Sequence, residues 1–140
     1  MYEEYTRQSL PQRQYRELLG SAIYVFNSNN SFIIENILKN DTGKCYSWYD
    51  LIDEPSGKLS QPIKETITRH SNTQIAQLFD KIVGTRNRII HSFPVTLDDE
   101  QVLHTKDKQH NQYTITEEFL MSFIKENEQL SLMLHDFRGY

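Results

Sequence analysis

Hydrophobic residues recur at steps of three and four positions over three parts of the chain, which is the pattern of helices that bury one side. The first part spans residues 11–39 and contains the polar segment 27–31 (NSNNS), so it predicts either one long helix or two helices. Pro11 suits a first helical turn, and residues 40–43 (NDTG) favour a stop after the last one.

The second helical part starts near Ser60 and is expected to break around residues 70–73 before continuing to Ser92. Phe93 closes it, because a residue that precedes proline is disfavoured in helical geometry. The third part is a final helix that opens at Thr116 with two acidic residues in its first turn. Its hydrophobic stripe consists of Leu120, Phe123, Ile124, Leu130, Met133 and Leu134.

Two other segments have their own patterns. Residues 100–106 (EQVLHTK) and 111–116 (NQYTIT) alternate polar and apolar positions, which predicts a small β-hairpin. Residues 45–58 (CYSWYDLIDEPSGK) favour a short helical turn over the main helices. We interpret four of its side chains as a cap on the core, the alternative being a surface that stacks bases; they are Tyr46, Trp48, Tyr49 and Leu51. The predicted fold class is all-α, a single domain over residues 1–140 with a bundle of about four main helices and a small β-hairpin before the last.

Composition narrows the range of partners. The formal net charge of −4 excludes a basic surface over the whole protein, so binding to nucleic acid must be local or must use a surface built from two subunits. Cys45 is the only cysteine, which excludes an intramolecular disulfide and a cysteine-based metal cluster in the monomer. No apolar stretch approaches the roughly 20 residues that span a membrane. We therefore expect a cytoplasmic protein with no membrane partner.

Arg86 lies on the centre line of a hydrophobic stripe. At 100° per residue, the apolar side chains of its helix fall within about 60° of it; these are Ile75, Phe79, Ile82, Val83, Ile89 and Ile90. A buried guanidinium without a partner costs several kcal/mol, so Arg86 must face a partner, an opening or another subunit. Asp80, Gly84, Asn87 and His91 form a separate strip, where the missing side chain of Gly84 leaves a groove for a helix or a phosphate.

Each of these residues also has an ordinary structural explanation. An arginine near a helix end is often paired with a carboxylate, and a histidine in the last turn often complements the helix dipole. Together, however, residues 86–91 (RNRIIH) match the pattern R-x4-H with a polar residue directly after the arginine. The chain in this respect resembles the HEPN superfamily (higher eukaryotes and prokaryotes nucleotide-binding). Its members are commonly metal-independent endoribonucleases of toxin–antitoxin, abortive-infection and CRISPR systems.

The resemblance implies an HEPN-like bundle that cleaves RNA without a cofactor or a metal ion, in a site shared across a homodimer. It implies catalytic roles for three residues: Arg86 holds the scissile phosphate, His91 transfers protons, and Asn87 orients one of them or the phosphate. Arg88 is a candidate RNA-binding residue, and Glu35, an acid of the first helix, is a candidate for positioning Arg86. An antitoxin protein is a candidate partner in addition to RNA.

The helical angle between Arg86 and His91 favours a site shared by two chains or a loosened last turn. Arg86 and His91 are about 140° apart on an ideal helix, so one straight helix does not aim both at one phosphate, whereas a dimeric cleft or a loosened last turn does. One branch of the family carries R-x4-H-x-Y, and Phe93 stands at the position of that tyrosine, so modification of its hydroxyl is excluded here.

Two classes of enzyme are disfavoured, and one alternative stays open. The five histidines are scattered without a His-x3-His or HExxH arrangement, and no G-x-S-x-G is present. The alternative is a non-catalytic HEPN-like module that binds nucleotide or RNA, or interacts with another protein.

Overall fold

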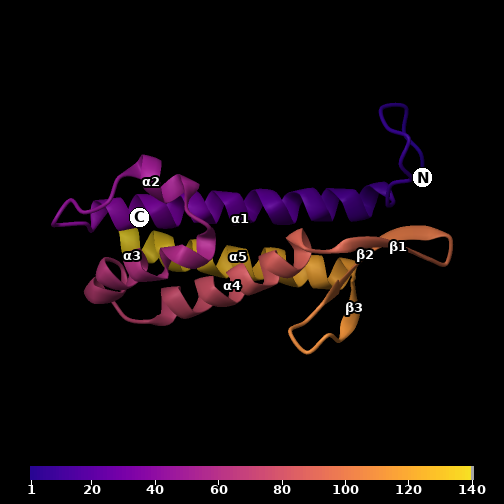
Figure 1. The fold of residues 1–140 in the computed structure, drawn as a ribbon. Helices are drawn as coiled ribbons and strands as arrows, with labels where there is room; N and C mark the ends of the chain where they lie inside the picture. Colours follow the sequence, from indigo (N-terminus) through magenta and orange to yellow (C-terminus); the bar gives the residue numbers. More distant parts are fainter. Residues whose placement is uncertain (140) are drawn as a thin grey trace.

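Three long helices lie side by side in the computed structural model, which describes residues 1–139 (Figure 1). They are α1 (Arg13–Lys39), α4 (Gln74–Ile90) and α5 (Glu117–Arg138). α1 and α5 run parallel, and α4 runs in the opposite direction beside them. The core at their centre contains a stack of phenylalanines, in which the Phe26 ring lies 6.3 Å from Phe79 and 6.3 Å from Phe123 between ring centroids.

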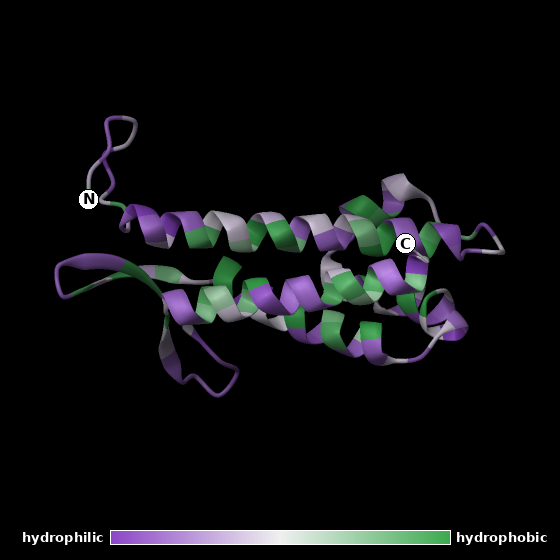
Figure 2. Ribbon diagram, turned by 180° about the vertical axis from the view of Figure 1, so that it is seen from behind, coloured by the Kyte–Doolittle hydropathy of each residue, from purple (hydrophilic) through white to green (hydrophobic). Residues whose placement is uncertain are grey.

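The polar segment 27–31 does not divide α1, which is one helix of 27 residues. Asn29 is the buried member of this segment, and its amide donates hydrogen bonds to the carbonyl oxygen of Asn127 (2.7 Å) and to its side-chain Oδ1 (3.0 Å). The buried amide is satisfied by α5, so no break in the helix is needed. Hydrophobic and hydrophilic bands alternate along the whole of α1 (Figure 2), as in a helix with one buried side.

Four short helical segments close the end of the bundle where α1 and α5 terminate (Figure 1). They are α2 (Trp48–Asp53), the 3-10 turns Ser56–Leu59 and Thr68–His70, and α3 (Ser60–Glu65) between those turns. The expected break around residues 70–73 is confirmed, because α4 begins only at Gln74.

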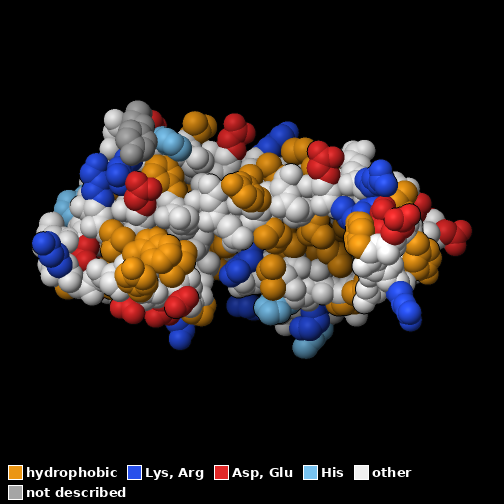
Figure 3. Space-filling view, turned by 90° about the horizontal axis from the view of Figure 1, so that it is seen from above, with side chains coloured by type: hydrophobic (Ala, Val, Ile, Leu, Met, Phe, Trp, Pro, Cys, Tyr) orange, Lys and Arg blue, Asp and Glu red, His pale blue; other side chains and the backbone are white. Residues whose placement is uncertain are grey.

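The predicted aromatic cap over the core is wrong for two of its residues. Leu51 is buried and Tyr46 packs at the edge of the core, but Trp48 is 47% exposed and Tyr49 is 77% exposed. A helix of six residues can turn only one side towards the core, and in α2 this side carries Leu51. Tyr49 therefore points away, and Trp48 meets it edge to face at 5.5 Å. Figure 3 shows a hydrophobic patch over α2 with acidic side chains beside it.

The predicted β-hairpin is present, but it belongs to a larger sheet. The hairpin strands are β2 (Glu100–Lys106) and β3 (Gln112–Ile115), and a further antiparallel strand, β1 (Phe93–Leu97), pairs with β2. Pro94 argues against a strand in sequence analysis. It is accommodated because β1 is an edge strand, where a missing N–H breaks no ladder. The predicted all-α class is therefore only approximately right.

Tyr15 fastens the sheet to the start of α1. Its hydroxyl donates a hydrogen bond to the carbonyl of Ile115 (2.6 Å) and accepts one from the amide of Leu103 (3.1 Å). Burial of this hydroxyl raises the pKa of Tyr15. The sheet is thereby fixed at the same end of the bundle as the last residues of α4 (Figure 1).

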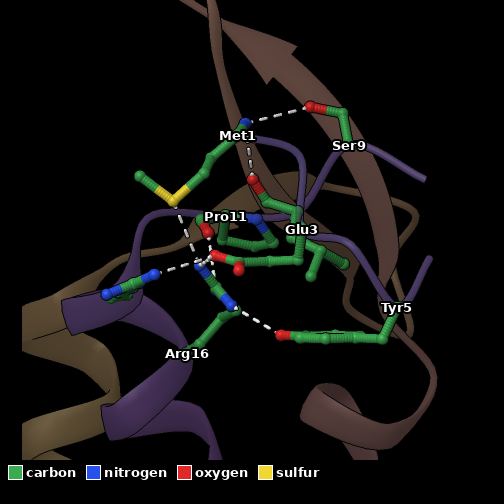
Figure 4. Close-up of polar contacts among 8 residues, drawn as sticks. Met1, Glu3, Tyr5, Ser9, Pro11 and Arg16 are labelled. Carbon is green, nitrogen blue, oxygen red and sulfur yellow. Dashed lines mark hydrogen bonds and ion pairs between the residues drawn. The ribbon is translucent and has the colours of Figure 1, made fainter. Parts of the chain in front are cut away.

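Residues 1–10 form a hook that is held against the first turn of α1 (Figure 4). The Arg16 guanidinium donates to the Pro11 carbonyl (2.8 Å), the Tyr5 hydroxyl (3.1 Å) and the Glu3 carboxylate (3.1 Å). Arg13 lies 3.5 Å from the same carboxylate. In the described part of the chain, none of the helices combines the length and the hydrophobicity needed to span a membrane.

Candidate functional site at the end of helix α4

The hydrophobic stripe of α4 faces the core as predicted, with one exception. Ile75, Phe79, Ile82, Val83 and Ile89 are buried. Ile90 is 52% exposed, so its predicted burial is wrong. It is the last residue of α4, one turn beyond Arg86, and at this point the stripe has run past the end of the core. Arg86 therefore lies where the stripe passes from the core to the surface.

The Arg86 side chain rests on an aromatic ring. Its guanidinium carbon lies 4.8 Å from the centroid of Phe26, which is itself buried. This is the geometry of a cation–π interaction. The ion pairs of residues 1–139 do not include Arg86, and its Nε is buried without a hydrogen-bond partner among them. Burial lowers the pKa of the guanidinium.

This arrangement answers the question that the sequence raises about Arg86. Its partner inside the chain is the face of Phe26 rather than a carboxylate. An aromatic face attracts a cation but does not neutralise it, so the positive charge remains available to an anion. Arg86 is half-buried, which gives such an interaction a lower local dielectric than bulk water.

His91 caps the C-terminal end of α4. Its backbone has φ −95° and ψ 23°, and its amide donates a 3.0 Å hydrogen bond to the Asn87 carbonyl. The imidazole is exposed and has no hydrogen bond to any other described residue. Because His91 lies outside the helix, the ideal helical angle of about 140° does not fix its direction. Within one chain, no hydrogen bond joins the side chains of Arg86, Asn87 and His91 among the described residues.

Arg88 and Glu35 have other partners than those expected. Nη1 of Arg88 donates a hydrogen bond to the backbone carbonyl of Lys106, which ties α4 to β2. Glu35 forms an ion pair with Arg138 at 3.0 Å. It lies nine residues beyond Phe26 on α1, about 13 Å along the helix axis. Glu35 therefore does not position Arg86, and that expectation is wrong.

Basic side chains gather around this end of α4. The hydrogen bond from Arg88 to β2 brings Arg88 close to the strand end that carries Lys106, and Lys108 follows in the turn. Asp107 is the acidic residue in the turn, and amide hydrogen bonds from Asn111 and Gln109, both 2.9 Å, hold its pKa below the ordinary value. Figure 3 shows basic and histidine side chains along one edge of the molecule, next to a notch that separates them from the α2 segment.

Sequence reasoning missed Phe26 and Lys106 as neighbours of the motif. Phe26 lies 60 positions before Arg86, and its periodicity marks it only as a core residue. Lys106 comes next to Arg88 because of the strand pairing. No local pattern in the sequence predicts the contact of Arg86 with Phe26 or that of Arg88 with Lys106.

A hollow lies elsewhere on the bundle. It is a groove of about 570 Å³ between α1 and α5, lined by Tyr24, Ser28, Ser31, Glu35, Ser131 and His135 among others. These α1 positions lie on the side of the helix opposite Phe26, so the groove does not open towards Arg86. Over residues 1–139, no group of three or more His, Cys, Asp or Glu side chains is arranged to hold a metal ion.

Comparison of the chain with protein-family models, with curated protein sequences and with solved structures found no match.

Proposed function

We propose that the protein is a metal-independent endoribonuclease of the HEPN type, acting in the cytoplasm as part of a toxin–antitoxin or phage-defence system. One observation carries the proposal: Arg86 is a half-buried cation without an acidic partner among residues 1–139, one helical turn from the exposed His91. A charge kept partly from water and not neutralised is stabilised by an incoming anion. The phosphodiester of RNA is such an anion.

The chemistry requires two proton transfers and a cation. A base removes the proton of the 2′-hydroxyl, the 2′-oxygen forms a bond to phosphorus, and the bond from phosphorus to the 5′-oxygen breaks as an acid protonates that oxygen. Histidine serves both steps because it ordinarily titrates near neutral pH. Arg86 stabilises the charge that develops on the phosphoryl oxygens. The products carry a 2′,3′-cyclic phosphate and a 5′-hydroxyl.

A homodimer supplies what one chain lacks. Arg86 is held on Phe26 and His91 lies exposed beyond the helix end, and no hydrogen bond joins the two side chains among residues 1–139. Two copies related by a two-fold axis bring two imidazoles to one cleft, one as base and one as acid. Ile90 is exposed on the same side of α4 as Arg86, and it offers an apolar contact for the second copy.

Local charge supports RNA as the substrate in spite of the net charge of −4. Arg88 is bonded to the strand end at Lys106, and Lys108 follows in the turn, whose acidic residue is Asp107. Basic side chains on one surface attract the phosphate backbone without requiring a basic protein. In this proposal Arg88 contacts RNA through the N–H groups that the Lys106 carbonyl does not occupy.

The experiment that tests the proposal is RNA cleavage in excess chelator, with wild type beside His91→Ala. We expect the variant to lose at least about 100-fold in rate. His110→Asn is the matched control, because His110 is an exposed histidine in the β2–β3 turn with φ 70°, a conformation that asparagine tolerates. Three results would contradict the mechanism: a requirement for a divalent metal, products with 3′-hydroxyl ends, or full activity of His91→Ala.

A second candidate is a non-catalytic module of the same fold that binds nucleotide, RNA or a protein. The observation in its favour is that no hydrogen bond joins Arg86 to His91 in one described chain. The two candidates differ in cells. Growth inhibition on expression that disappears with His91→Ala, or on co-expression of an antitoxin protein, supports the nuclease. Inhibition that persists with His91→Ala supports the binding module.

A further inference from the structure

The sheet has one covered face and one open face. In β2, Leu103 and Thr105 point inward, and Thr105 is fully buried. Of the intervening residues, Val102 still packs at the edge of the core, whereas His104 lies on the outer face, where the β1 register sets Phe93 opposite it. Phe93 is 38% exposed and Leu97, at the far end of the same strand and on the same face, is 44% exposed.

Phe93 and His104 form a pair of rings on this open face. Their centroids lie 6.2 Å apart, with the ring planes tilted by 55°. The Nδ1 atom of His104 lies 3.3 Å from the hydroxyl of Thr114 on β3, which steadies the imidazole. The pair therefore joins the first residue of the edge strand β1 to the central strand β2, and both rings belong to strands rather than to a loop.

The position of this pair relative to His91 follows from the strand register. His91 comes two residues before Phe93, and Lys106 comes two residues after His104 on the antiparallel neighbour. His91 and Lys106 therefore lie at the same end of the β1–β2 ladder. His91 and Phe93 are two residues apart, so their Cα atoms lie at most about 7 Å apart, which is the scale of one nucleotide. A nucleotide bound at His91 therefore has its neighbour within reach of the rings.

From this placement we infer that Phe93 and His104 form a base-stacking subsite, which holds the nucleotide next to the scissile phosphate of single-stranded RNA. The inference rests on the proposed nuclease function and adds a substrate class to it. Aromatic rings beside basic side chains are the combination that binds single strands, because every base has a face to stack and every nucleotide has a phosphate. Arg88 and Lys106 flank the rings on the side of His91, so charge favours RNA over an apolar protein surface.

The test uses short single-stranded RNA in excess chelator, with either a normal or an abasic nucleotide next to one defined cleavage site. Both the rate of cleavage and the affinity, from fluorescence anisotropy with the His91→Ala protein, are measured. We expect Phe93→Leu, which keeps an apolar side chain but removes the ring, to weaken both about tenfold for the normal RNA. His104→Ala is expected to act in the same direction.

Neither substitution is expected to change cleavage or binding of the abasic RNA, and Phe93→Tyr is expected to retain the wild-type preference. Leu97→Ala is the matched control, since Leu97 lies on the same strand and face with similar exposure but at the other end of β1. Equal discrimination between normal and abasic RNA by wild type and Phe93→Leu overturns the subsite.

Different results refute the proposed subsite and the proposed nuclease function. Wild-type cleavage that Phe93→Leu leaves unchanged refutes the subsite alone. Absence of cleavage refutes the nuclease, and the anisotropy comparison of normal and abasic RNA then still decides the subsite. Light scattering tests a third possibility, that the face is a protein interface. If Phe93→Leu and Leu97→Ala both convert a dimer to a monomer, and binding of normal and abasic RNA falls equally, the face is a protein interface and the inference is overturned.

Discussion

The guanidinium carbon of Arg86 lies 4.8 Å from the ring centroid of Phe26. Phe26 is in turn in contact with two further rings of the core, Phe79 and Phe123, at 6.3 Å each. The position of the cation is thus set by the packing of α1, α4 and α5 together. A carboxylate in place of the ring would hold the guanidinium equally well but would compete with a phosphate for it.

Replacement of Phe26 by leucine tests whether Phe26 supports Arg86 in addition to stabilising the core. Phe26→Leu and Phe79→Leu each remove one ring from the same stack, and we expect each to lower the free energy of unfolding by about 1–2 kcal/mol in urea denaturation. Only Phe26→Leu removes the surface beneath Arg86, so only this variant is expected to lose more than about tenfold in RNA cleavage at temperatures where both are folded. Equal losses in the two variants would show that Phe26 acts only through stability.

Replacement of Arg86 by methionine tests whether this arginine is kept for function. The variant loses a cation–π contact of about 0.5–1 kcal/mol but no longer buries part of a charge. We expect the free energy of unfolding to change by less than about 1 kcal/mol, whereas cleavage falls at least about 100-fold. Arg88→Met is the comparison, because it removes the hydrogen bond to the Lys106 carbonyl and is expected to cost about 1 kcal/mol. A large destabilisation by Arg86→Met would assign Arg86 a structural role.

Tyr15→Phe removes the hydroxyl that joins α1 to two strands. The Leu103 amide and the Ile115 carbonyl each lose a partner in a buried place. We expect a loss of about 1–3 kcal/mol in the free energy of unfolding. Faster hydrogen exchange is expected at the amide of Leu103. Tyr24→Phe is the control, since Tyr24 is 76% exposed, and a similar loss there would contradict this account.

The hook formed by residues 1–10 is expected to loosen in acid. The hydrogen bond from Arg16, with the charges of Arg16 and Arg13, holds the pKa of Glu3 below its ordinary value of 4.5. A carboxyl group with a lowered pKa in the folded state contributes stability above its unfolded pKa, and this contribution is lost as the pH falls through the folded value. NMR titration is expected to give Glu3 a midpoint below its ordinary value of 4.5.

The contact between Glu3 and Arg16 can also be tested at neutral pH. Glu3→Gln is expected to speed trypsin cleavage after the exposed Arg7, because the hook is released from Arg16. Glu4→Gln preserves the Glu3 contact and is expected to leave the cleavage rate unchanged. If Glu3 titrates at its ordinary value and both variants are cleaved alike, Arg16 does not hold the hook in solution.

Local signals in the sequence were sufficient for the helices. Thr116 was expected to open the last helix, and its hydroxyl accepts a hydrogen bond from the Phe119 amide at 3.0 Å. The break before Gln74 and the β2–β3 hairpin were also predicted correctly. β1 was missed because the argument from Pro94 holds for a central strand, and whether a strand is at an edge depends on its neighbours.

The candidate site was predictable only in part. The angle of Arg86 on its helix showed that a cation faces the core, but not that Phe26 would meet it, because this contact joins distant parts of the chain. Ile90 was placed by periodicity and Trp48 by the aromatic character of its segment, and neither signal shows where the neighbouring elements end. Their exposure depends on the lengths of those elements and appears only in the folded chain.

The parallel pairing of α1 with α5 also affects how the chain matures on the ribosome. Asn29 and Asn127, which bond across this pair, are 98 positions apart, so that length of chain is synthesised after Asn29 before the two can meet. Contacts this distant in sequence form late and slow the search for the native state. Until then the apolar side of α1 has no lasting cover, and nascent chains depend on the speed of translation, or on a chaperone, to avoid association with one another.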